Sequence, residues 1–326
     1  MASSRILIAG GNGLIGSRLA QKLRERGETV DILTRGDTRV IPGDKPLIWI
    51  HWEPGVMLEI SPEDHYDVVI NLAGESLSHI PWTKKRKAAI IASRLESTQS
   101  LVNWMEHAVE PPRLFISGSA VGYYGSRGDE DLTEESDFGT GFLANLTQAW
   151  EKITDGIPAQ TRVAFIRTGI VLAQSGALTP LRKLTSMFLG GKLGSGKQWW
   201  PWISLDDEVR AIMHIIDNEI HGPVNLVGPT PATQEEGGRA LATALKRPFW
   251  LPAPGFAINL LLGDAGRELL LTSQKVHPTV LEGSGFVFEH TTVEQAIAAA
   301  LEVPEGVAAE SETEPAPVVV EEPETD

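Results

Sequence analysis

The fold of this chain is decided by a stretch near its start, Arg5-Ile6-Leu7-Ile8-Ala9-Gly10-Gly11-Asn12-Gly13-Leu14-Ile15-Gly16. An apolar run of strand length leads directly into closely spaced glycines, and a helical pattern of Leu19, Ala20 and Leu23 follows. Glycine allows the chain to turn sharply where a Cβ atom would prevent it. The stretch therefore predicts a strand, a tight turn and a helix that packs back on the strand.

The spacing of the glycines indicates what the turn binds. Gly11, Gly13 and Gly16 match G-x-G-x-x-G, while Gly10, Gly13 and Gly16 match G-x-x-G-x-x-G. Unpaired N–H groups and the positive dipole end of the following helix suit a pyrophosphate. We therefore expect a dinucleotide to contact Gly10, Gly13, Leu14, Ile15 and Gly16. The alternative is an ordinary strand-to-helix turn without a ligand.

The end of the next expected strand, Glu28 to Arg35, indicates which dinucleotide binds. NAD-binding proteins place an acidic residue there to hold the ribose hydroxyls, whereas an arginine accommodates the 2′-phosphate of NADP. Here the strand ends in Thr34 and Arg35, and Arg39 follows. A planar guanidinium suits a phosphate, so the sequence predicts NADP(H) as the cofactor. The alternative is that these arginines are solvated surface residues.

Strands and helices alternate along the chain, which is typical of a parallel, doubly wound sheet. Further strands are expected at 47–50, at 67–74, from 114 and over 162–172. Thr83 is expected to cap a long helix that runs to about His107, and the basic run Lys84–Lys87 to be a solvated face. The predicted fold class is α/β, a Rossmann-type doubly wound parallel sheet with a smaller C-terminal α+β lobe.

Three stretches carry a family resemblance: Gly10–Gly16, Asn71–Gly74 and Ser117–Gly125. They resemble the extended short-chain dehydrogenases/reductases, and more specifically an atypical branch of epimerase family proteins, also labelled sugar-nucleotide epimerases or SulA-like division factors. The resemblance covers roughly residues 5–300. Supporting stretches are Trp82-Thr83, Ser93-Arg94, Phe142–Ala144, Trp150-Glu151, Arg167–Gly169, Leu193–Gly196, Trp202-Ile203 with Asp206-Asp207, and Gly222–Asn225.

The resemblance implies further contacts with the cofactor. In this family the segment that corresponds to Arg162–Leu172 passes beside the nicotinamide. The implied contacts, besides Thr34 and Arg35, are Leu72, Ala73, Gly74, Glu75, Ser117, Arg167 and Gly169.

The catalytic pattern of the wider superfamily is incomplete in this chain. Active members use a serine with a Tyr-x-x-x-Lys pair on one helical face. Ser119, or Ser117, fits the serine, but Phe142 with Leu146, or Leu143 with Thr147, takes the place of the pair. Phe142, Leu146 and Trp150 instead form an apolar stripe typical of a core. Ser119 and Tyr123 remain the catalytic candidates, with Tyr124, Glu75 or a substrate group as other possible acids.

The second half is expected to form one unit with the first, spanning residues 1–301. Its cofactor-binding core comprises about 1–170 and 203–228, and its C-terminal lobe about 171–202 and 229–301. Trp199, Trp200 and Trp202 are expected either to line a substrate pocket or to pack the lobe. Asp206 and Asp207 are expected to begin a helix, and Thr233 with Glu236 to form a capping box.

Composition limits the function classes. The chain has 326 residues, no cysteine and a net charge of −15. Nine of these charges lie in residues 302–326, which carry no base and are predicted to be a disordered acidic tail; without them the charge is −6. The role expected for the acidic tail is either to keep the protein soluble or to bind a protein partner. Nucleic acid is not an expected partner, and the histidines show no metal-ligand spacing.

No apolar run reaches the ~20 residues of a membrane span, and the early first strand leaves no room for a signal or transit peptide. We expect a cytoplasmic or stroma-like reducing compartment. The predicted function is an NADP(H)-binding oxidoreductase or epimerase-like enzyme on an unknown small organic substrate. The alternative is a catalytically silent NADP(H)-binding regulatory or scaffold protein, linked to division or organelle maintenance. The sequence does not indicate the oligomeric state.

Overall fold

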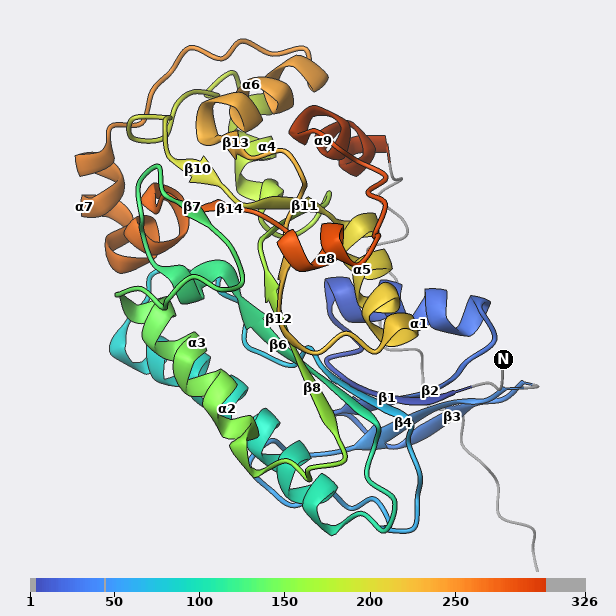
Figure 1. The fold of residues 1–326 in the computed structure, drawn as a ribbon. Helices are drawn as coiled ribbons and strands as arrows, with labels where there is room; N and C mark the ends of the chain where they lie inside the picture. The colour runs from blue at the N-terminus through green and yellow to red at the C-terminus, as the bar shows by residue number, and fades with distance from the viewer. Residues whose placement is uncertain (1–3, 44, 303–326) are drawn as a thin grey trace, which may run out of the picture.

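Eight strands form one large sheet in the computed structural model, which describes residues 4–43 and 45–302 (Figure 1). Their order is β12-β8-β6-β5-β1-β2-β4-β3, and only β3 and β4 pair in antiparallel fashion. The predicted Rossmann-type sheet is confirmed. The strands are β1 (Arg5–Ala9), β2 (Thr29–Thr34), β3 (Arg39–Ile41), β4 (Leu47–His51), β5 (Val68–Asn71), β6 (Leu114–Ala120), β8 (Arg162–Thr168) and β12 (Gly222–Leu226).

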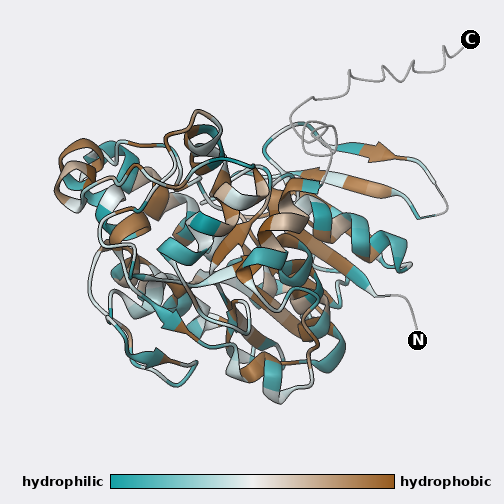
Figure 2. Cartoon of the chain, turned by 90° about the horizontal axis from the view of Figure 1, so that it is seen from above, coloured by the Kyte–Doolittle hydropathy of each residue, from teal (hydrophilic) through white to brown (hydrophobic). Residues whose placement is uncertain are grey.

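Helices cover both faces of the sheet. Side chains of successive strand residues point to opposite faces, so the apolar strands present hydrophobic surface on each face. Ile6 and Ile8 of β1 pack in one core cluster with α1 (Leu14–Glu25) and α5 (Leu205–Asn218). Leu7 packs in the opposite cluster with α2 (Lys84–His107), beside which lies α3 (Phe142–Lys152) (Figure 1). Burial on both faces explains why the central strands are continuously hydrophobic (Figure 2).

Helix α2 begins where the sequence predicts. The Thr83 side chain accepts a hydrogen bond from the backbone N–H of Arg86, at 3.1 Å. The expected solvated face is correct for Lys84 and Lys85, which are exposed. It is wrong for Arg86 and Lys87, which are partly buried and form ion pairs with Glu75 and Asp264. The run of basic residues alone does not show that carboxylates from distant segments form ion pairs with it.

The expected single strand over 162–172 is wrong, because the chain leaves the large sheet at Gly169. Residues Ile170–Leu172 form β9, which pairs with β11 (Trp202–Ser204) instead. A Cβ on Gly169 would overlap the carbonyl oxygen of Pro201. The apolar pattern continues through the break, so it does not reveal the change of partner strand.

The short hairpin strand β3 was not expected from the sequence, and it determines where Arg39 lies. The Arg39 guanidinium stacks over the Trp49 ring at 4.4 Å. This leaves Arg35 as the guanidinium at the end of β2.

The remaining elements build the smaller lobe and its connections. Its core cluster includes Leu172, Trp202, Leu241 and Ile297, so packing is the observed role of Trp202. The predicted capping box of Thr233 and Glu236 is confirmed. The elements are η1 (Val121–Tyr124), β7 (Asp131–Leu132), η2 (Ile153–Gly156), α4 (Leu178–Ser186), β10 (Trp199–Trp200), β13 (Ala232–Thr233), α6 (Gln234–Ala244), α7 (Gly255–Gly266), η3 (Arg267–Leu271), β14 (Lys275–Val276), α8 (Thr279–Gly283) and α9 (Val293–Glu302).

The predicted acidic tail lies, from residue 303 on, outside the described residues. Within the described part of the chain, no helix combines the length and apolar character needed to cross a membrane. In the same part, no group of three or more His, Asp or Glu side chains is arranged to hold a metal ion.

Candidate functional site

The glycine-rich turn joins β1 to α1 in a form that requires glycine. Gly10 has φ +82°, which lies in the left-handed region. A Cβ on Gly10 would lie 2.5 Å from the carbonyl carbon of Leu72, and one on Gly16 would overlap the carbonyl oxygen of Gly10. The backbone of the glycine-rich turn therefore packs directly against the backbone of the chain after β5. The first helical turn of α1 packs against the glycine-rich turn in the same way.

The N-terminus of α1 carries no side-chain cap. Gly13 is the extended N-cap residue, its N–H donates to the Gly10 carbonyl at 3.0 Å, and the first helical turn contains no acidic residue. The N–H groups of the first turn belong to Leu14, Ile15 and Gly16, and the first N–H groups of a helix have no partner within it. An anion fits this place, since the helix dipole adds positive potential there.

The end of β2 lies beside this turn, and neither Thr34 nor Arg35 there is acidic. Thr34 is buried, and its hydroxyl accepts a hydrogen bond from the Gly36 N–H at 3.1 Å. The Arg35 side chain is exposed. Arg86 above all, and also Arg35, hold the pKa of Glu75 below its ordinary value. Arg35 and Glu75 thus lie close enough to interact, although they come from different strand ends.

The chain after β5 is fixed by buried polar contacts. The amide of Asn71 donates to Thr98 Oγ1 at 2.9 Å, and its carbonyl oxygen accepts from the Ala73 N–H at 3.1 Å. A Cβ on Gly74 would lie 3.2 Å from the Arg94 guanidinium carbon. Burial lowers the pKa of Arg94 to about 10. Leu72, Ala73 and Gly74 are therefore held beside the glycine turn.

Beyond β6 the structure brings together a serine, a carboxylate and a guanidinium. The Ser119 hydroxyl donates to Glu151 Oε1 at 2.7 Å. Arg167 donates from Nε and Nη2 to the two Glu151 oxygens, both at 2.9 Å. The side chains of Arg167 and Glu151 are 4% and 13% exposed, so this is a buried, bidentate ion pair with the catalytic candidate Ser119 attached.

The two tyrosines after β6 complete this network. Arg167 Nη1 donates to the Tyr124 hydroxyl at 3.0 Å, and that hydroxyl donates to Asn225 Oδ1 at 2.7 Å. Burial raises the pKa of Tyr124 to about 12, although Arg167 opposes the shift. The guanidinium carbon of Arg167 also lies 3.5 Å from the ring centre of Tyr123. All three nitrogens of Arg167 have protein partners, so its expected cofactor contact stays a prediction.

Neither alignment of the missing Tyr-x-x-x-Lys pair offers a substitute at the same positions. Leu143 packs against Gly122, where a Cβ would lie 3.0 Å from the leucine Cβ. The Thr147 hydroxyl bonds back to the carbonyls of Leu143 and Ala144. Phe142 packs against Trp82, at 5.4 Å between ring centres.

Glu151 is the functional candidate that sequence reasoning missed. It lies four residues after Thr147, and residues four apart share a helix face. That face holds the Tyr and Lys in active members of the superfamily. The spacing could therefore have drawn attention to Glu151, but only the fold brings it to Ser119.

Ser117 and the end of β8 lie deeper in the protein. Ser117 is fully buried within β6. Thr168, which precedes Gly169, donates through its hydroxyl to Glu208 Oε1 at 2.8 Å. Glu208 is fully buried, and among the described residues its Oε2 has no hydrogen-bond partner. Burial raises the pKa of Glu208 to about 8, so this acid holds its proton at neutral pH.

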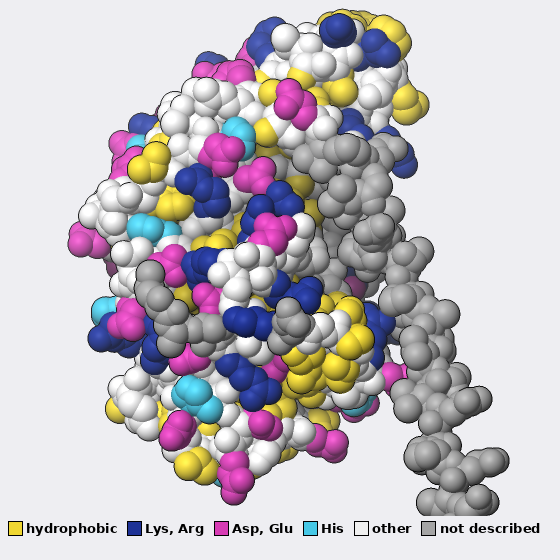
Figure 3. Space-filling view, turned by 90° about the vertical axis from the view of Figure 1, so that its right-hand side faces the viewer, with side chains coloured by type: hydrophobic (Ala, Val, Ile, Leu, Met, Phe, Trp, Pro, Cys, Tyr) yellow, Lys and Arg dark blue, Asp and Glu magenta, His cyan; other side chains and the backbone are white. Residues whose placement is uncertain are grey.

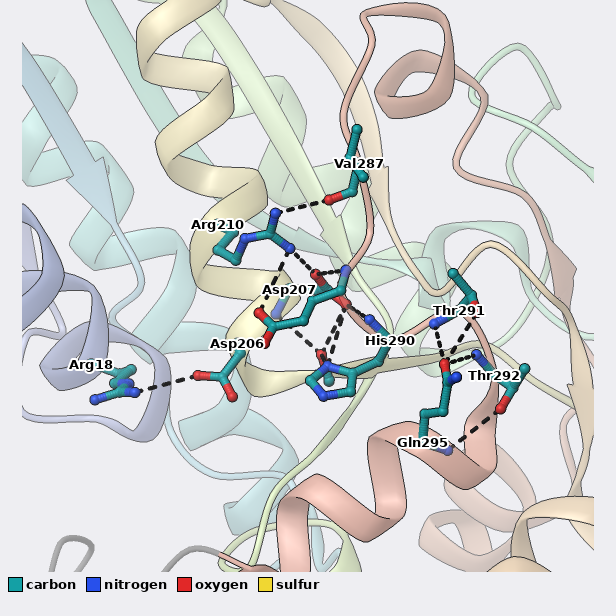
Figure 4. A network of polar contacts seen from close by, with 11 residues as sticks. Arg18, Asp206, Asp207, Arg210, Val287, His290, Thr291, Thr292 and Gln295 are labelled. Carbon is teal, nitrogen blue, oxygen red and sulfur yellow. Dashed lines mark hydrogen bonds and ion pairs between the residues drawn. The ribbon is translucent and has the colours of Figure 1, made fainter.

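The neighbouring Asp207 is equally buried but fully paired (Figure 4). Its oxygens accept hydrogen bonds from the backbone N–H groups of Glu289 and His290, both at 2.9 Å, and from Arg210 at 2.6 Å. These contacts attach the segment before α9 to the start of α5. The expected helix start at Asp206 and Asp207 is confirmed, with Ser204 as the capping residue.

The fold and the site define a class: a Rossmann-type protein with a glycine-rich turn suited to a dinucleotide and a buried cluster of Ser119, Glu151 and Arg167 beyond β6. Residues 6–147 match the NAD dependent epimerase/dehydratase family, and residues 253–300 match a domain of unknown function, DUF1731. Epimerase family protein ML0860 of Mycobacterium leprae is 40% identical over 298 residues, which cover 90% of this chain and 94% of that relative. The chain belongs to the NAD dependent epimerase/dehydratase family, among its epimerase family proteins, as the resemblance implied.

Two solved structures are also similar. The human epimerase family protein SDR39U1 (isoform 2), solved with NADPH, has a TM-score of 0.81 and 29% identity and covers 92% of this chain and 100% of its own. A nucleoside-diphosphate sugar epimerase from Corynebacterium glutamicum has a TM-score of 0.72 and 33% identity, covering 95% of this chain and 62% of its own.

Proposed function

We propose that this protein binds NADP(H) and acts as an oxidoreductase or epimerase-like enzyme on a small organic substrate. One observation carries the cofactor proposal: the uncapped N-terminus of α1 lies beside the end of β2, where Arg35 stands in place of an acidic residue. An acidic residue there would repel a 2′-phosphate, whereas a guanidinium attracts it. The NADPH in the human relative's structure supports the same cofactor.

The residues present fit this cofactor in the proposed arrangement. The N–H groups of Leu14, Ile15 and Gly16 hold the pyrophosphate above Gly10 and Gly13, and Thr34 and Arg35 take the 2′-phosphate. Leu72, Ala73, Gly74 and Glu75 line the path toward β6, where Ser117, Arg167 and Gly169 are the remaining predicted contacts. Bound NADP(H) supplies or accepts the hydride of the reaction.

Ser119 and Glu151 replace the usual proton relay in this proposal. A substrate hydroxyl passes its proton to Ser119 Oγ as the Ser119 proton moves to Glu151 Oε1, across the 2.7 Å hydrogen bond that joins them. In the opposite direction, the same two oxygens return a proton to the substrate. Arg167 holds the Glu151 carboxylate in place through two parallel hydrogen bonds. Tyr123, packed on the Arg167 guanidinium, is the second candidate beside the substrate.

Turnover is the test of the proposed activity. Purified protein is mixed with NADPH and a panel of aldehydes, ketones and nucleotide sugars, and loss of reduced-nicotinamide absorbance is followed. We expect at least one compound to turn over in the wild type, and Ser119→Ala and Glu151→Gln to lower kcat by about 100-fold. The control Gln99→Ala alters an exposed residue of α2 whose side-chain amide donates to Asn103, outside the proposed site. Binding of NADPH without turnover of any compound would favour the silent regulatory protein instead.

The division into a cofactor-binding core and a C-terminal lobe stays a prediction.

A further inference from the structure

The C-terminal lobe has a surface hollow that the proposed catalytic function does not use. It has a volume of about 510 Å³ and is lined by Arg182, Lys183, Ser186, Met187, Ala244, Leu245 and Leu301. Helices α4, α6 and α9 end at its rim, at Ser186, Ala244 and Glu302. We call it the basic hollow.

The basic hollow concentrates positive charge. Arg182 and Lys183 line it, and Lys246 and Arg247 follow directly after its lining residue Leu245. Three helix C-termini contribute about half a negative charge each and the exposed Glu302 adds one more, a sum that Lys183, Lys246 and Arg247 together exceed. Among the described residues, no carboxylate forms an ion pair with Lys183, Lys246 or Arg247. The hollow therefore presents net positive potential to an acidic ligand.

The hollow also offers apolar surface beside its cations. Met187 is 64% exposed and Phe188 is 53% exposed. The Arg247 guanidinium lies 4.8 Å from the ring centre of Phe188, and its Nε donates to the Ser186 carbonyl. Basic and hydrophobic side chains also stand together at the upper right of the face seen in Figure 3. A ligand that fits the hollow combines carboxylates with a short apolar stretch.

The chain itself contains such a segment, and it starts at the hollow. Leu301 lines the hollow, and residues 303–326 follow after Glu302. This segment carries acidic residues and no base, and its apolar triplet Val318–Val320 is followed directly by Glu321 and Glu322. About 17 residues separate Leu301 from the triplet, a length that spans up to ~55 Å, so the triplet can return to the hollow.

We propose that residues 303–326 dock into the basic hollow of the same molecule. Val318–Val320 contact Met187 and Leu245, while the flanking carboxylates pair with Lys183, Lys246 and Arg247. Single surface ion pairs contribute little, so the docking depends on several pairs together and on the apolar contact. It is sensitive to salt for the same reason. The proposal is independent of the nucleotide and of turnover.

Cysteine cross-linking tests the docking, since the chain has no native cysteine. The test protein carries Ser186→Cys and Val319→Cys. The matched control carries Val319→Cys together with Gln99→Cys, at an exposed position of α2. Under mild oxidation we expect the test pair to form an intramolecular disulfide about ten-fold faster than the control pair, because docking raises the effective concentration. High salt, or Arg182→Glu with Lys183→Glu, should reduce the rate to that of the control.

Three outcomes separate the possibilities. Faster intramolecular cross-linking that salt and charge reversal abolish supports the proposal. Equal rates for both pairs overturn it. Disulfides formed chiefly between molecules also overturn it, and indicate that the segment binds a second copy. Replacing Val318 and Val320 by serine in the test protein, with Cys at position 319 and all charges kept, should slow the test pair and leave thermal unfolding of the folded part unchanged.

Discussion

The two ends of the proposed site differ in what they are made of. The nucleotide end consists mainly of backbone: Gly10 and Gly16 approach neighbouring carbonyl groups so closely that any side chain would collide. The proton-transfer end consists of side chains, with Ser119, Glu151 and Arg167 joined in one hydrogen-bonded cluster. Backbone recognition depends on a few glycines, whereas a side-chain cluster can be rebuilt from other residues.

This difference explains how the chain combines an intact glycine-rich turn with an absent Tyr-Lys pair. Replacing that pair leaves the glycine turn untouched, because the two ends share no side chain. The cluster around Arg167 then supplies charge and hydroxyl groups at the place where the pair is missing. The following predictions test whether the two ends are separable in this way.

The largest effect is expected at the proton-transfer end. Glu151→Ala leaves the guanidinium of Arg167 buried without its carboxylate, and should lower the free energy of unfolding by about 3–5 kcal/mol. Urea denaturation measures the change. The double variant Glu151→Leu with Arg167→Met removes both charges and should regain most of the stability, yet remain inactive. A single variant as stable as the wild type would contradict the buried ion pair.

The next largest effect is expected at the nucleotide end. Gly16→Ala places a methyl group against the Gly10 carbonyl oxygen, and should raise the Kd for NADPH by about 100-fold, equivalent to about 2.7 kcal/mol. The control Gly283→Ala adds a Cβ that meets nothing within 4 Å. Fluorescence titration gives both affinities, and circular dichroism checks the fold. Unchanged affinity in Gly16→Ala would place the nucleotide elsewhere.

A smaller effect concerns Glu208, which accepts a hydrogen bond from Thr168 at the end of β8. Its pKa is raised from 4.5 to about 8 in the folded protein, so the folded state keeps a proton that the unfolded state loses above pH 4.5. The free energy of unfolding should therefore fall as the pH rises from about 5 to 8, and level off above. Glu208→Gln should remove about 2 kcal/mol of this fall between pH 6 and 8, measured by urea denaturation across pH. Parallel curves for both proteins would contradict a protonated Glu208.

The sequence predicts the first strand, the glycine turn and several helix starts well, because glycine spacing, strand length and capping residues are local signals. The strand of Arg5–Ala9, the cap at Thr83 and the capping box of Thr233 follow from neighbouring residues alone. The change of strand partner at Gly169 could not be predicted, since it depends on the distant Pro201.

The cluster of Ser119, Glu151 and Arg167 could not be assembled from the sequence, because its members are joined by contacts between distant segments. Ser119 and Glu151 are 32 residues apart in the sequence, and only the packing of α3 against β6 joins them. Glu208 left a weaker signal: it shares the inward face of α5 with Ile212 and Ile215, a place where an acid is unusual.

The central claim is that Arg35 makes this an NADP(H) site, and one titration tests it most directly. NADPH and NADH are each titrated into wild type and Arg35→Ala, and the nicotinamide fluorescence is followed. The account predicts tight binding of NADPH in the wild type, a loss of about ten-fold in the variant, equivalent to about 1.4 kcal/mol, and little change for NADH. Equal losses for both nucleotides, or NADH bound more tightly than NADPH by the wild type, would contradict it.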